Sequence, residues 1–173
     1  MASWPGRRRA ARVVVFDPAG RILLISARNP AAAGGGHWWE IPGGGIDRGE
    51  SSEQAAEREL WEEAGIRDAQ LGPVVWTQSV EFSFGGMRFD QDEWIHVATC
   101  DGTTNPPGGL EFLEAAAFGE QRWWSPDELC ASGERTIPYR LAEFLPDLVE
   151  HGAPSEPIDI TPSTRQVRDW NRS

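Results

Sequence analysis

The sequence predicts an α/β fold in one domain, with both strands and helices. Its 173 residues are enough for a single domain with a hydrophobic core, and 39% of them are hydrophobic, including nine Trp. Short segments rich in β-branched and aromatic residues alternate with turn-forming residues, which is typical of strands. One longer segment has a helix-forming composition with clear start and stop signals.

The first predicted elements are strands. Arg12–Phe16 and Arg21–Ser26 are rich in β-branched and apolar residues, and Asp17–Gly20 between them is a good type I turn, so we expect a hairpin. Their apolar residues run continuously, which favours strands covered on both faces. Asn29–Gly36 then reads as a flexible loop, and His37–Ile41 as a short strand that leads into a glycine-rich loop.

The strongest element is a helix that ends at Ala64. Ser51 and Gln54 have the spacing of a capping box, in which a hydroxyl and an amide satisfy the first backbone N–H groups. Between them and Ala64 there is no Gly, Pro or β-branched residue, and Ala, Leu, Glu, Gln and Arg dominate. Gly65 supplies the stop, because the residue after a helix often needs positive φ.

The rest of the chain contains strands and two further helices. Four strand segments are expected, with a two-residue hairpin turn at Gly85-Gly86, over Val74–Thr77, Ser79–Phe84, Met87–Asp90 and Trp94–Thr99. A last short strand is followed by a brief helix and an amphipathic helix that Pro146 should kink or break, over Arg122–Trp124, Ser125–Cys130 and Tyr139–Glu150. We therefore expect a flexible N-terminal arm over 1–11, the domain over 12–150 and an extended tail over 151–173.

Three carboxylates share one arc of the main helix. Glu59, Glu62 and Glu63 stand at i, i+3 and i+4, and such like charges destabilise an isolated helix by about 0.2–0.5 kcal/mol per pair. A divalent cation would remove that cost, and oxygen-only ligands favour Mg²⁺ first and Mn²⁺ second. A solvated helix face is the simpler reading. It does not explain the glycine-rich loop, or Glu50 and Arg58 at fixed offsets.

The segment Gly44–Ile66 resembles a complete Nudix box, the signature of the Nudix hydrolases. Every fixed position of that pattern is filled, by Gly44, Glu50, Arg58, Glu59, Leu60, Glu62, Glu63, Gly65 and Ile66. The resemblance implies a Nudix-like α/β/α sandwich with a mixed β-sheet and a loop-helix-loop catalytic motif. It also implies metal-dependent hydrolysis of a phosphoanhydride bond in a nucleoside diphosphate linked to another group, such as a nucleoside triphosphate or a nucleotide sugar.

The same resemblance implies roles for the box residues. A divalent ion would be held by the helix acids Glu59, Glu62 and Glu63 and by a loop carbonyl near Gly43 or Gly44. Glu50 would be an outer metal ligand or a brace for the loop. Arg58 is expected to be structural and to pair with a box acid such as Glu62, four residues on. In this family the general base is a box Glu or a Glu on a later loop. Our order is Glu63 or Glu62 first, with Glu120 and Glu114 behind and Glu111 as a further candidate.

Substrate contacts are less constrained by the sequence. Arg28, just after a strand, is a candidate for a phosphate contact, and a surface role is equally compatible. Trp38 and Trp39 are candidates to stack on a base, although one of an adjacent pair on a strand normally faces the core. Phe82 and Phe84 are further candidates for stacking, and we select them with Trp39. The Pro and Tyr typical of ADP-ribose and dinucleoside polyphosphate subfamilies are absent from this window, so nucleoside triphosphates and nucleotide sugars stay open.

Charge and cysteine content limit the partners. The net charge of −11 argues against general binding of a nucleic-acid polymer, so a small nucleotide-type substrate is expected. All 16 basic residues are Arg, so any fixed positive charge on a phosphate must come from Arg. Two cysteines imply no disulfide framework and favour the cytoplasm, and no apolar run predicts a membrane span. A homodimer is compatible with the family. The alternative function is a non-catalytic Nudix module that binds a nucleotide as a sensor or interaction domain.

Overall fold

A computed structural model describes residues 2–3, 6–31, 36–105, 110 and 112–172. The helices within these residues are α1 (Ser52–Ala64), α2 (Phe112–Ala117), α3 (Pro126–Ser132), α4 (Leu141–His151) and α5 (Thr164–Arg172). None of them is both long enough and apolar enough to cross a bilayer. The strands are β1 (Ala2–Ser3), β2 (Arg8–Phe16), β3 (Ile22–Arg28), β4 (His37–Glu40), β5 (Gly43–Gly45), β6 (Gln70–Phe84), β7 (Met87–Thr99), β8 (Phe118–Trp124), β9 (Thr136–Ile137) and β10 (Ile158–Asp159).

The described strands form one mixed sheet in the order β10-β6-β7-β2-β3-β4-β9, with β1 on β7, β5 on β2 and β8 on β3. β6 and β7 are antiparallel, as are β2 and β3, whereas β2 and β7 are parallel. The predicted hairpin between β2 and β3 is present, and Phe16 pairs with Ile22 across its turn. The Gly85-Gly86 turn is also confirmed, and both glycines have positive φ.

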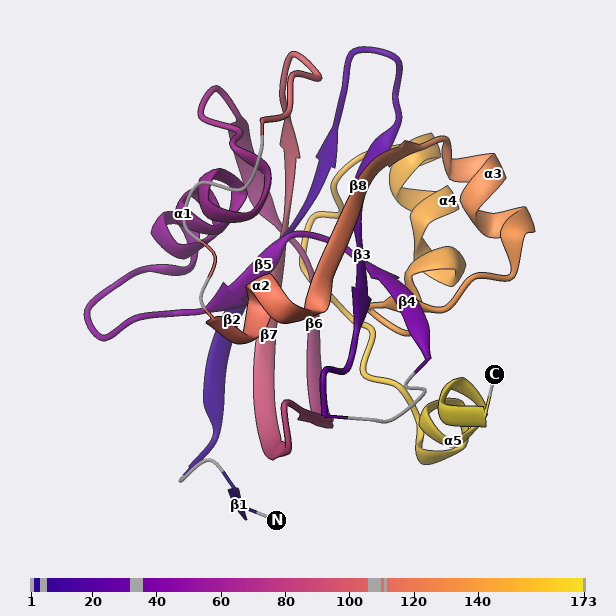
Figure 1. The fold of residues 1–173 in the computed structure, drawn as a ribbon. Coiled ribbons are helices and arrows are strands. Elements are labelled where there is room, and N and C mark those ends of the chain that lie inside the picture. The colour runs from indigo at the N-terminus through magenta and orange to yellow at the C-terminus, as the bar shows by residue number, and fades with distance from the viewer. Residues whose placement is uncertain (1, 4–5, 32–35, 106–109, 111, 173) are drawn as a thin grey trace.

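Helices cover both faces of the sheet, with α1 on one side and α3 and α4 on the other (Figure 1). Successive side chains of β2 point to opposite faces of the sheet. Val13 and Val15 belong to the core under α1, together with Leu60, while Val14 belongs to the core under α4, together with Leu145. This alternation confirms the expectation that the continuous apolar strands are buried on both faces, and it gives the predicted α/β fold.

Several predicted boundaries are wrong. Arg8–Ala11, assigned to a flexible arm, begin β2 and pair with β5 and β7. Gly72 and Pro73 do not end a strand, because register shifts on either side of Val74 accommodate them inside β6. Pro146 does not end α4.

The C-terminal tail is the largest correction to the predicted fold. Residues 151–173 were expected to be extended, but Ile158–Asp159 form β10 beside β6, and α5 follows. The reason is tertiary, because β10 completes an otherwise open sheet edge and α5 is held by one aromatic side chain. Trp170 donates its indole N–H to the carbonyl of Thr136 at 2.9 Å and lies over the ring of Tyr139.

Candidate active site

Capping residues fix where helix α1 begins and ends, as the sequence predicts. The hydroxyl of Ser51 accepts from the backbone N–H of Gln54, and the amide oxygen of Gln54 accepts from the backbone N–H of Ser51. Gly65 ends the helix in the left-handed conformation, with φ of 66°. Leu60 is fully buried beneath the helix. The caps and this anchor fix where the acidic residues of the helix project.

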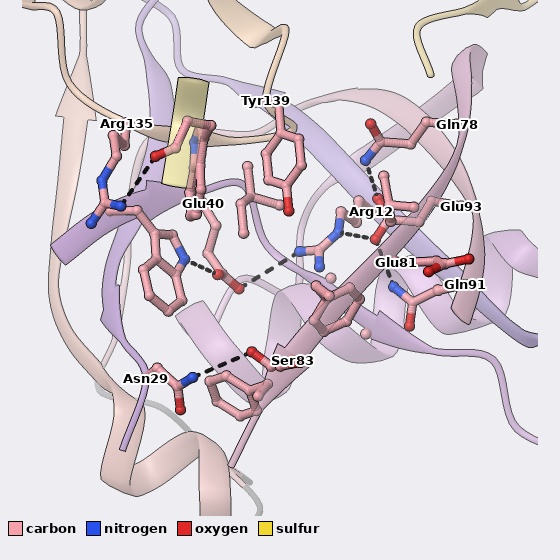
Figure 2. A pocket seen from close by; sticks show the side chains of 18 of the residues that line it. Arg12, Asn29, Glu40, Gln78, Glu81, Ser83, Gln91, Glu93, Arg135 and Tyr139 are labelled. Carbon is pink, nitrogen blue, oxygen red and sulfur yellow. Dashed lines mark hydrogen bonds and ion pairs between the residues drawn. The ribbon is translucent and has the colours of Figure 1, made fainter. Parts of the chain in front are cut away.

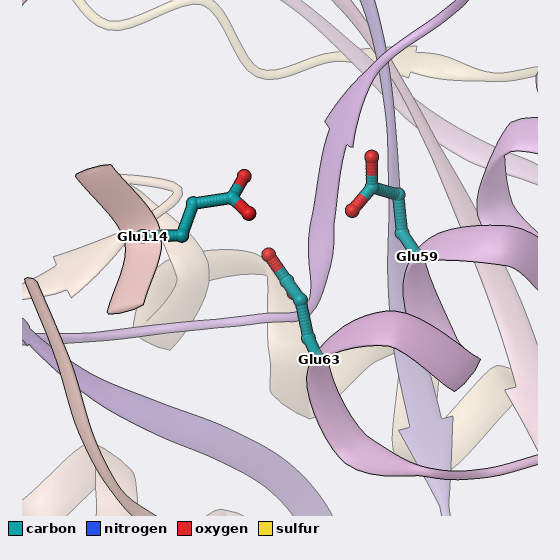
Figure 3. Close-up of side chains that lie close together, drawn as sticks. All are labelled: Glu59, Glu63 and Glu114. Atoms are coloured by element: carbon teal, nitrogen blue, oxygen red, sulfur yellow. The ribbon is translucent and has the colours of Figure 1, made fainter. Parts of the chain in front are cut away.

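Three carboxylates from distant parts of the chain converge beside α1. Glu59 and Glu63 project from α1 and Glu114 from α2, and Figure 3 shows the three side chains directed toward one another. Each offers an oxygen within 4.8 Å of the others. One oxygen of Glu63 accepts from the backbone N–H of Gly43 at 2.9 Å, while its second oxygen is buried and has no hydrogen-bond partner among the described residues. We call Glu59, Glu63 and Glu114 the acid cluster.

Arg58 connects several acids of the box with the glycine-rich loop. Its guanidinium donates to both oxygens of Glu50 at 2.9 and 3.0 Å, to Glu59 at 2.9 Å and to Glu62 at 3.2 Å. It also donates to the carbonyl of Gly45 at 2.8 Å, which fastens the glycine-rich loop to the helix. The predicted pairing with Glu62 is confirmed. Glu50 belongs to this network, and its hydrogen bond to Arg58 lowers its pKa.

The acid cluster is electrostatically unfavourable without a cation. Burial raises the pKa of Glu59 to about 7, even though the charge of Arg58 opposes this shift and that of Glu114 adds to it. Burial also raises the pKa of Glu63 well above its ordinary value, and the charges of Glu59 and Glu40 add to the effect. Both shifts come mainly from desolvation of a charged oxygen.

The donor set fits a hard divalent cation. It consists of carboxylate oxygens, without His or Cys, and it includes the unpartnered buried oxygen of Glu63. A Cβ on Gly44 would lie 2.4 Å from a carboxylate oxygen of Glu59, so a larger residue here would displace that carboxylate. The glycine thus lets the loop backbone lie close to the acids.

A pocket of about 500 Å³ opens beside the acid cluster. Glu114 belongs to both, and Gly43 and Gly44 line the pocket next to it. Its floor is a buried polar network on β2, β6 and β7 (Figure 2). Arg12 donates to Glu93 at 3.0 Å and lies 3.6 Å from Glu40. Burial raises the pKa of Glu40, although the charge of Arg12 opposes the shift.

Aromatic side chains form the walls of this pocket. Trp38 donates its indole N–H to Glu40 at 2.7 Å and faces Trp170 of α5 at 5.9 Å between ring centroids. Phe82 of β6 lies nearly parallel to Phe89, with 5.2 Å between ring centroids. Tyr139, from the segment that connects α3 and α4, also lines the pocket. The pocket therefore combines a polar floor with flat apolar walls, which is typical of small-molecule sites.

Only some of the predicted substrate residues line the pocket. Phe82 and Phe84 line the pocket, but Trp39 does not, because it is buried in the core against Trp124 at 5.2 Å. Its neighbour Trp38 lies on the pocket side of β4 instead. Arg28 is exposed at the end of β3 and is absent from the described pocket lining.

The candidate bases also differ in position. Glu114 belongs to both the acid cluster and the pocket, whereas Glu120 is exposed on β8. Glu62 is held by Arg58 and does not belong to the cluster of described acids. Glu111 lies outside the described residues. Sequence reasoning placed Glu114 behind Glu62 and Glu63, because its distance from α1 along the sequence hides its proximity in space.

The polar floor of the pocket was missed entirely. Gln78 on β6 and Gln91 and Glu93 on β7 share a side of the sheet with core residues such as Trp76 and Ile95. The available signal was therefore a set of polar residues at even spacing on strands whose other members on that side are apolar. Such positions are buried, and buried polar groups normally bond to one another or to a ligand.

Comparison with known proteins places these features in a family. A family model described as the NUDIX domain matches residues 6–148. A protein named RNA pyrophosphohydrolase from Azorhizobium caulinodans is 39% identical over 149 residues, which cover 77% of this chain and 84% of that protein. One of the same name from Bartonella quintana is 42% identical over 67 residues, or 37% and 39% of the two chains, so this match spans about two fifths of that relative. The structure of a NUDIX hydrolase from Nitrosomonas europaea superposes with a TM-score of 0.64 at 17% identity, and covers 92% of this chain and 81% of that one.

Proposed function

This chain belongs to the Nudix domain family, and from that premise we propose that it is a pyrophosphohydrolase acting on a nucleoside diphosphate linked to a further group. The observation that carries the proposal is the convergence of Glu59, Glu63 and Glu114 at the end of a pocket with aromatic walls. A non-catalytic nucleotide-binding module is not favoured, because every acid of the box is present and the matched relatives are named as enzymes.

Glu59, Glu63 and Glu114 would hold the cation, with a carbonyl near Gly43 or Gly44 as a further ligand. We propose Mg²⁺, with Mn²⁺ as the second choice, because these ions prefer oxygen ligands. The ion supplies neutralisation of phosphate charge and polarisation of the phosphate oxygens. The acidic protein thereby gains affinity for an acidic substrate. Arg58 holds Glu59 and the loop in place, and Glu50 holds Arg58.

Of the candidate bases, we propose that Glu114 accepts the proton of the attacking water. Its half-buried side chain belongs both to the acid cluster and to the lining of the pocket. Glu62 is occupied by its ion pair with Arg58, and Glu120 is exposed on β8.

Replacing Glu114 by Gln should lower kcat by about 100-fold or more, the usual contribution of a positioned base. Glu120→Gln should change kcat less than twofold, and so should Glu57→Gln on the exposed side of α1. Steady-state kinetics of the three purified variants measures this. A large loss in Glu120→Gln with a normal Glu114→Gln would instead make Glu120 the base.

The substrate class is tested by a panel of nucleoside triphosphates, nucleotide sugars and a 5′-triphosphorylated RNA, assayed with Mg²⁺, with Mn²⁺ and with EDTA. The RNA is a second candidate because the Azorhizobium relative is named for that substrate, and Arg8 of the pocket could meet its phosphates. We expect release of pyrophosphate or phosphate only with metal. Binding of a nucleotide without turnover under any of these conditions would instead support the non-catalytic module.

A further inference from the structure

Helix α5 supplies two residues to the pocket, although it lies C-terminal to the matched domain. These residues, Trp170 and Asn171, stand near the C-terminal end of the helix. The helix lies near β4, where the ring of Trp170 faces that of Trp38 (Figure 1). Glu114 of the acid cluster lines the same pocket. The tail of the chain therefore forms part of the cavity in which we expect the substrate to bind.

The composition of α5 separates two explanations for its position. A helix that served only to extend the hydrophobic core would bury an apolar face. The nine residues of α5 include only two apolar ones, Val167 and Trp170, and none of the nine is buried. Trp170 packs on residues of the pocket wall and belongs to neither of the two described core clusters. This arrangement favours a role in the pocket over a role in the core.

Trp170 is held in a fixed place by polar contacts. Its indole N–H donates to the carbonyl of Thr136 at 2.9 Å, and the guanidinium of Arg135 lies 4.7 Å from the centroid of its ring. Arg135 also donates to the carbonyl of Trp170 at 3.3 Å and to that of His37 at 3.0 Å. These contacts fasten the end of α5 to β9 and to β4.

The fixed indole contacts two rings that line the pocket. The centroid of the Trp170 ring lies 4.8 Å from that of Tyr139 and 5.9 Å from that of Trp38. Trp38 is held on β4 and donates to Glu40, whereas Tyr139 stands on the turn between β9 and α4 and depends on packing for its position. Without Trp170 a space would open beside both rings, and they would no longer be fixed by close packing.

We propose that Trp170 is a positioning residue of the substrate pocket, which holds Trp38 and Tyr139 as a fixed wall for the part of the substrate beyond its diphosphate. This inference rests on the proposed function for the identity of the substrate. Aromatic rings in fixed positions suit a flat, partly apolar group such as a nucleotide base. Trp170 acts through the two rings, and α5 is thereby a functional part of the site.

This role predicts a particular kinetic signature. A wall that is already in place lowers the cost of ordering the site when substrate binds. Binding that the ground state and the transition state share changes KM and leaves kcat unchanged. The acid cluster of Glu59, Glu63 and Glu114 contains no residue of α5, so the chemical step should not depend on Trp170.

The test compares Trp170→Ala with the unaltered protein on ATP, GTP and UDP-glucose in the presence of Mg²⁺. We expect KM for each substrate that is turned over to rise about tenfold, and kcat to change less than twofold. Trp170→Phe keeps a ring beside the wall and should recover most of the affinity. Arg168→Ala, at an exposed position of the same helix, should change neither constant. An unchanged KM in a folded Trp170→Ala variant overturns the proposal.

A double-mutant comparison tests whether Trp170 acts through the wall. Tyr139→Ala should raise KM by itself. Combined with Trp170→Ala it should raise KM by less than the product of the two single effects, because both changes disturb the same wall. Effects that multiply would contradict the assignment. Circular dichroism checks the fold of each variant, and if Trp170→Ala does not fold, Trp170→Leu, which keeps an apolar side chain without a ring, takes its place in both comparisons.

The two proposals fail in different ways. A protein that turns over any of the three nucleotides with the same KM in Trp170→Ala and in the parent supports the proposed function and removes the role of Trp170. If no substrate is turned over, the proposed function fails, and calorimetric titration with the same nucleotides and Mg²⁺ decides the second proposal. Binding to Trp170→Ala that is about tenfold weaker supports the wall, whereas equal binding, or no binding to the parent, overturns it.

Discussion

Hydrolysis by the Glu63→Gln variant should fall by about a thousandfold, with the fold intact. Glu63 is 1% exposed, one of its oxygens is fixed by the N–H of Gly43, and the other is unpartnered at the acid cluster. The amide keeps the size of the side chain but loses the charge that would hold a cation, and metal-assisted charge stabilisation contributes several kcal/mol. Steady-state kinetics with Mg²⁺ measures the fall in hydrolysis, and circular dichroism measures whether the fold is intact.

The same variant should be more stable than the parent when metal is removed. The pKa values of Glu59 and Glu63 are raised above that of an unfolded Glu, so the folded chain holds their protons more tightly than the unfolded chain. Their contribution to stability is complete below about pH 4.3, the pKa of an unfolded Glu, and is lost as pH rises through the folded values, about 7 for Glu59. Glu63→Gln replaces one of the two ionising groups by a neutral amide, so the variant should lose less stability as pH rises.

Metal should reverse the difference. With Mg²⁺ at about 100 times its Kd, the parent should gain about 2.7 kcal/mol of unfolding free energy, because the ion binds only the folded chain. Glu63→Gln should gain much less. Denaturant unfolding at pH 8 with and without Mg²⁺ measures both effects, and Glu57→Gln on the exposed side of α1 is the matched control. Equal gains in Glu63→Gln and the parent would remove Glu63 from the metal site.

Arg12→Met should destabilise the protein by about 3–5 kcal/mol and lower Tm by about 10 °C. Arg12 is 7% exposed, and its guanidinium lies 3.0 Å from Glu93 and 3.6 Å from Glu40. It also donates to the carbonyl of Ile41 at 3.3 Å. Methionine fills much of the space but leaves two buried carboxylates without their cation, and that loss is far larger than the loss of an exposed pair.

Two further variants make this prediction specific. Arg7→Met breaks an ion pair with Asp92, at 2.8 Å, whose partners are partly exposed, and it should change stability by less than about 1 kcal/mol. Adding Glu93→Gln to Arg12→Met should recover part of the loss, because it removes one of the two stranded charges. Thermal unfolding of the four proteins is the measurement. An Arg12→Met protein that melts within 2 °C of the parent, at roughly no cost in free energy, would contradict the buried-network interpretation.

Pro146 shows why local rules need tertiary context. A proline inside a helix leaves the carbonyl four residues earlier without its usual donor, so a kink or break was predicted. In the structure α4 continues through this position, and the carbonyl concerned, that of Ala142, accepts from the thiol of Cys130 on α3 at 3.5 Å. A partner from a different helix takes the place of the missing backbone bond.

In the site, too, some residues could be placed from local sequence and others only from the tertiary structure. Glu59 and Glu63 were grouped correctly, because a helix fixes the direction of residues four apart, whereas Glu62 pairs with Arg58 and lies outside the acid cluster. Glu114 joined Glu59 and Glu63 only through the pairing of β8 with β3, which positions the preceding helix α2. Of the two stacking candidates, Trp38 lines the pocket and Trp39 lies in the core. Alternation along a strand says that two neighbours differ without saying which one faces the core.

By itself, the sequence determined helix α1 with both of its caps, the hairpin turns, the acidic arc and the family to which these belong. Those features depend on hydrogen bonds and spacings within a few residues of the chain. Only the tertiary structure decided that the tail returns as β10 and α5, that Glu114 completes the acid cluster, and that Arg12, Gln78, Gln91 and Glu93 form the floor of the pocket. Those features depend on which strands pair and in which register, and side chains far apart in the sequence meet only after that pairing is made.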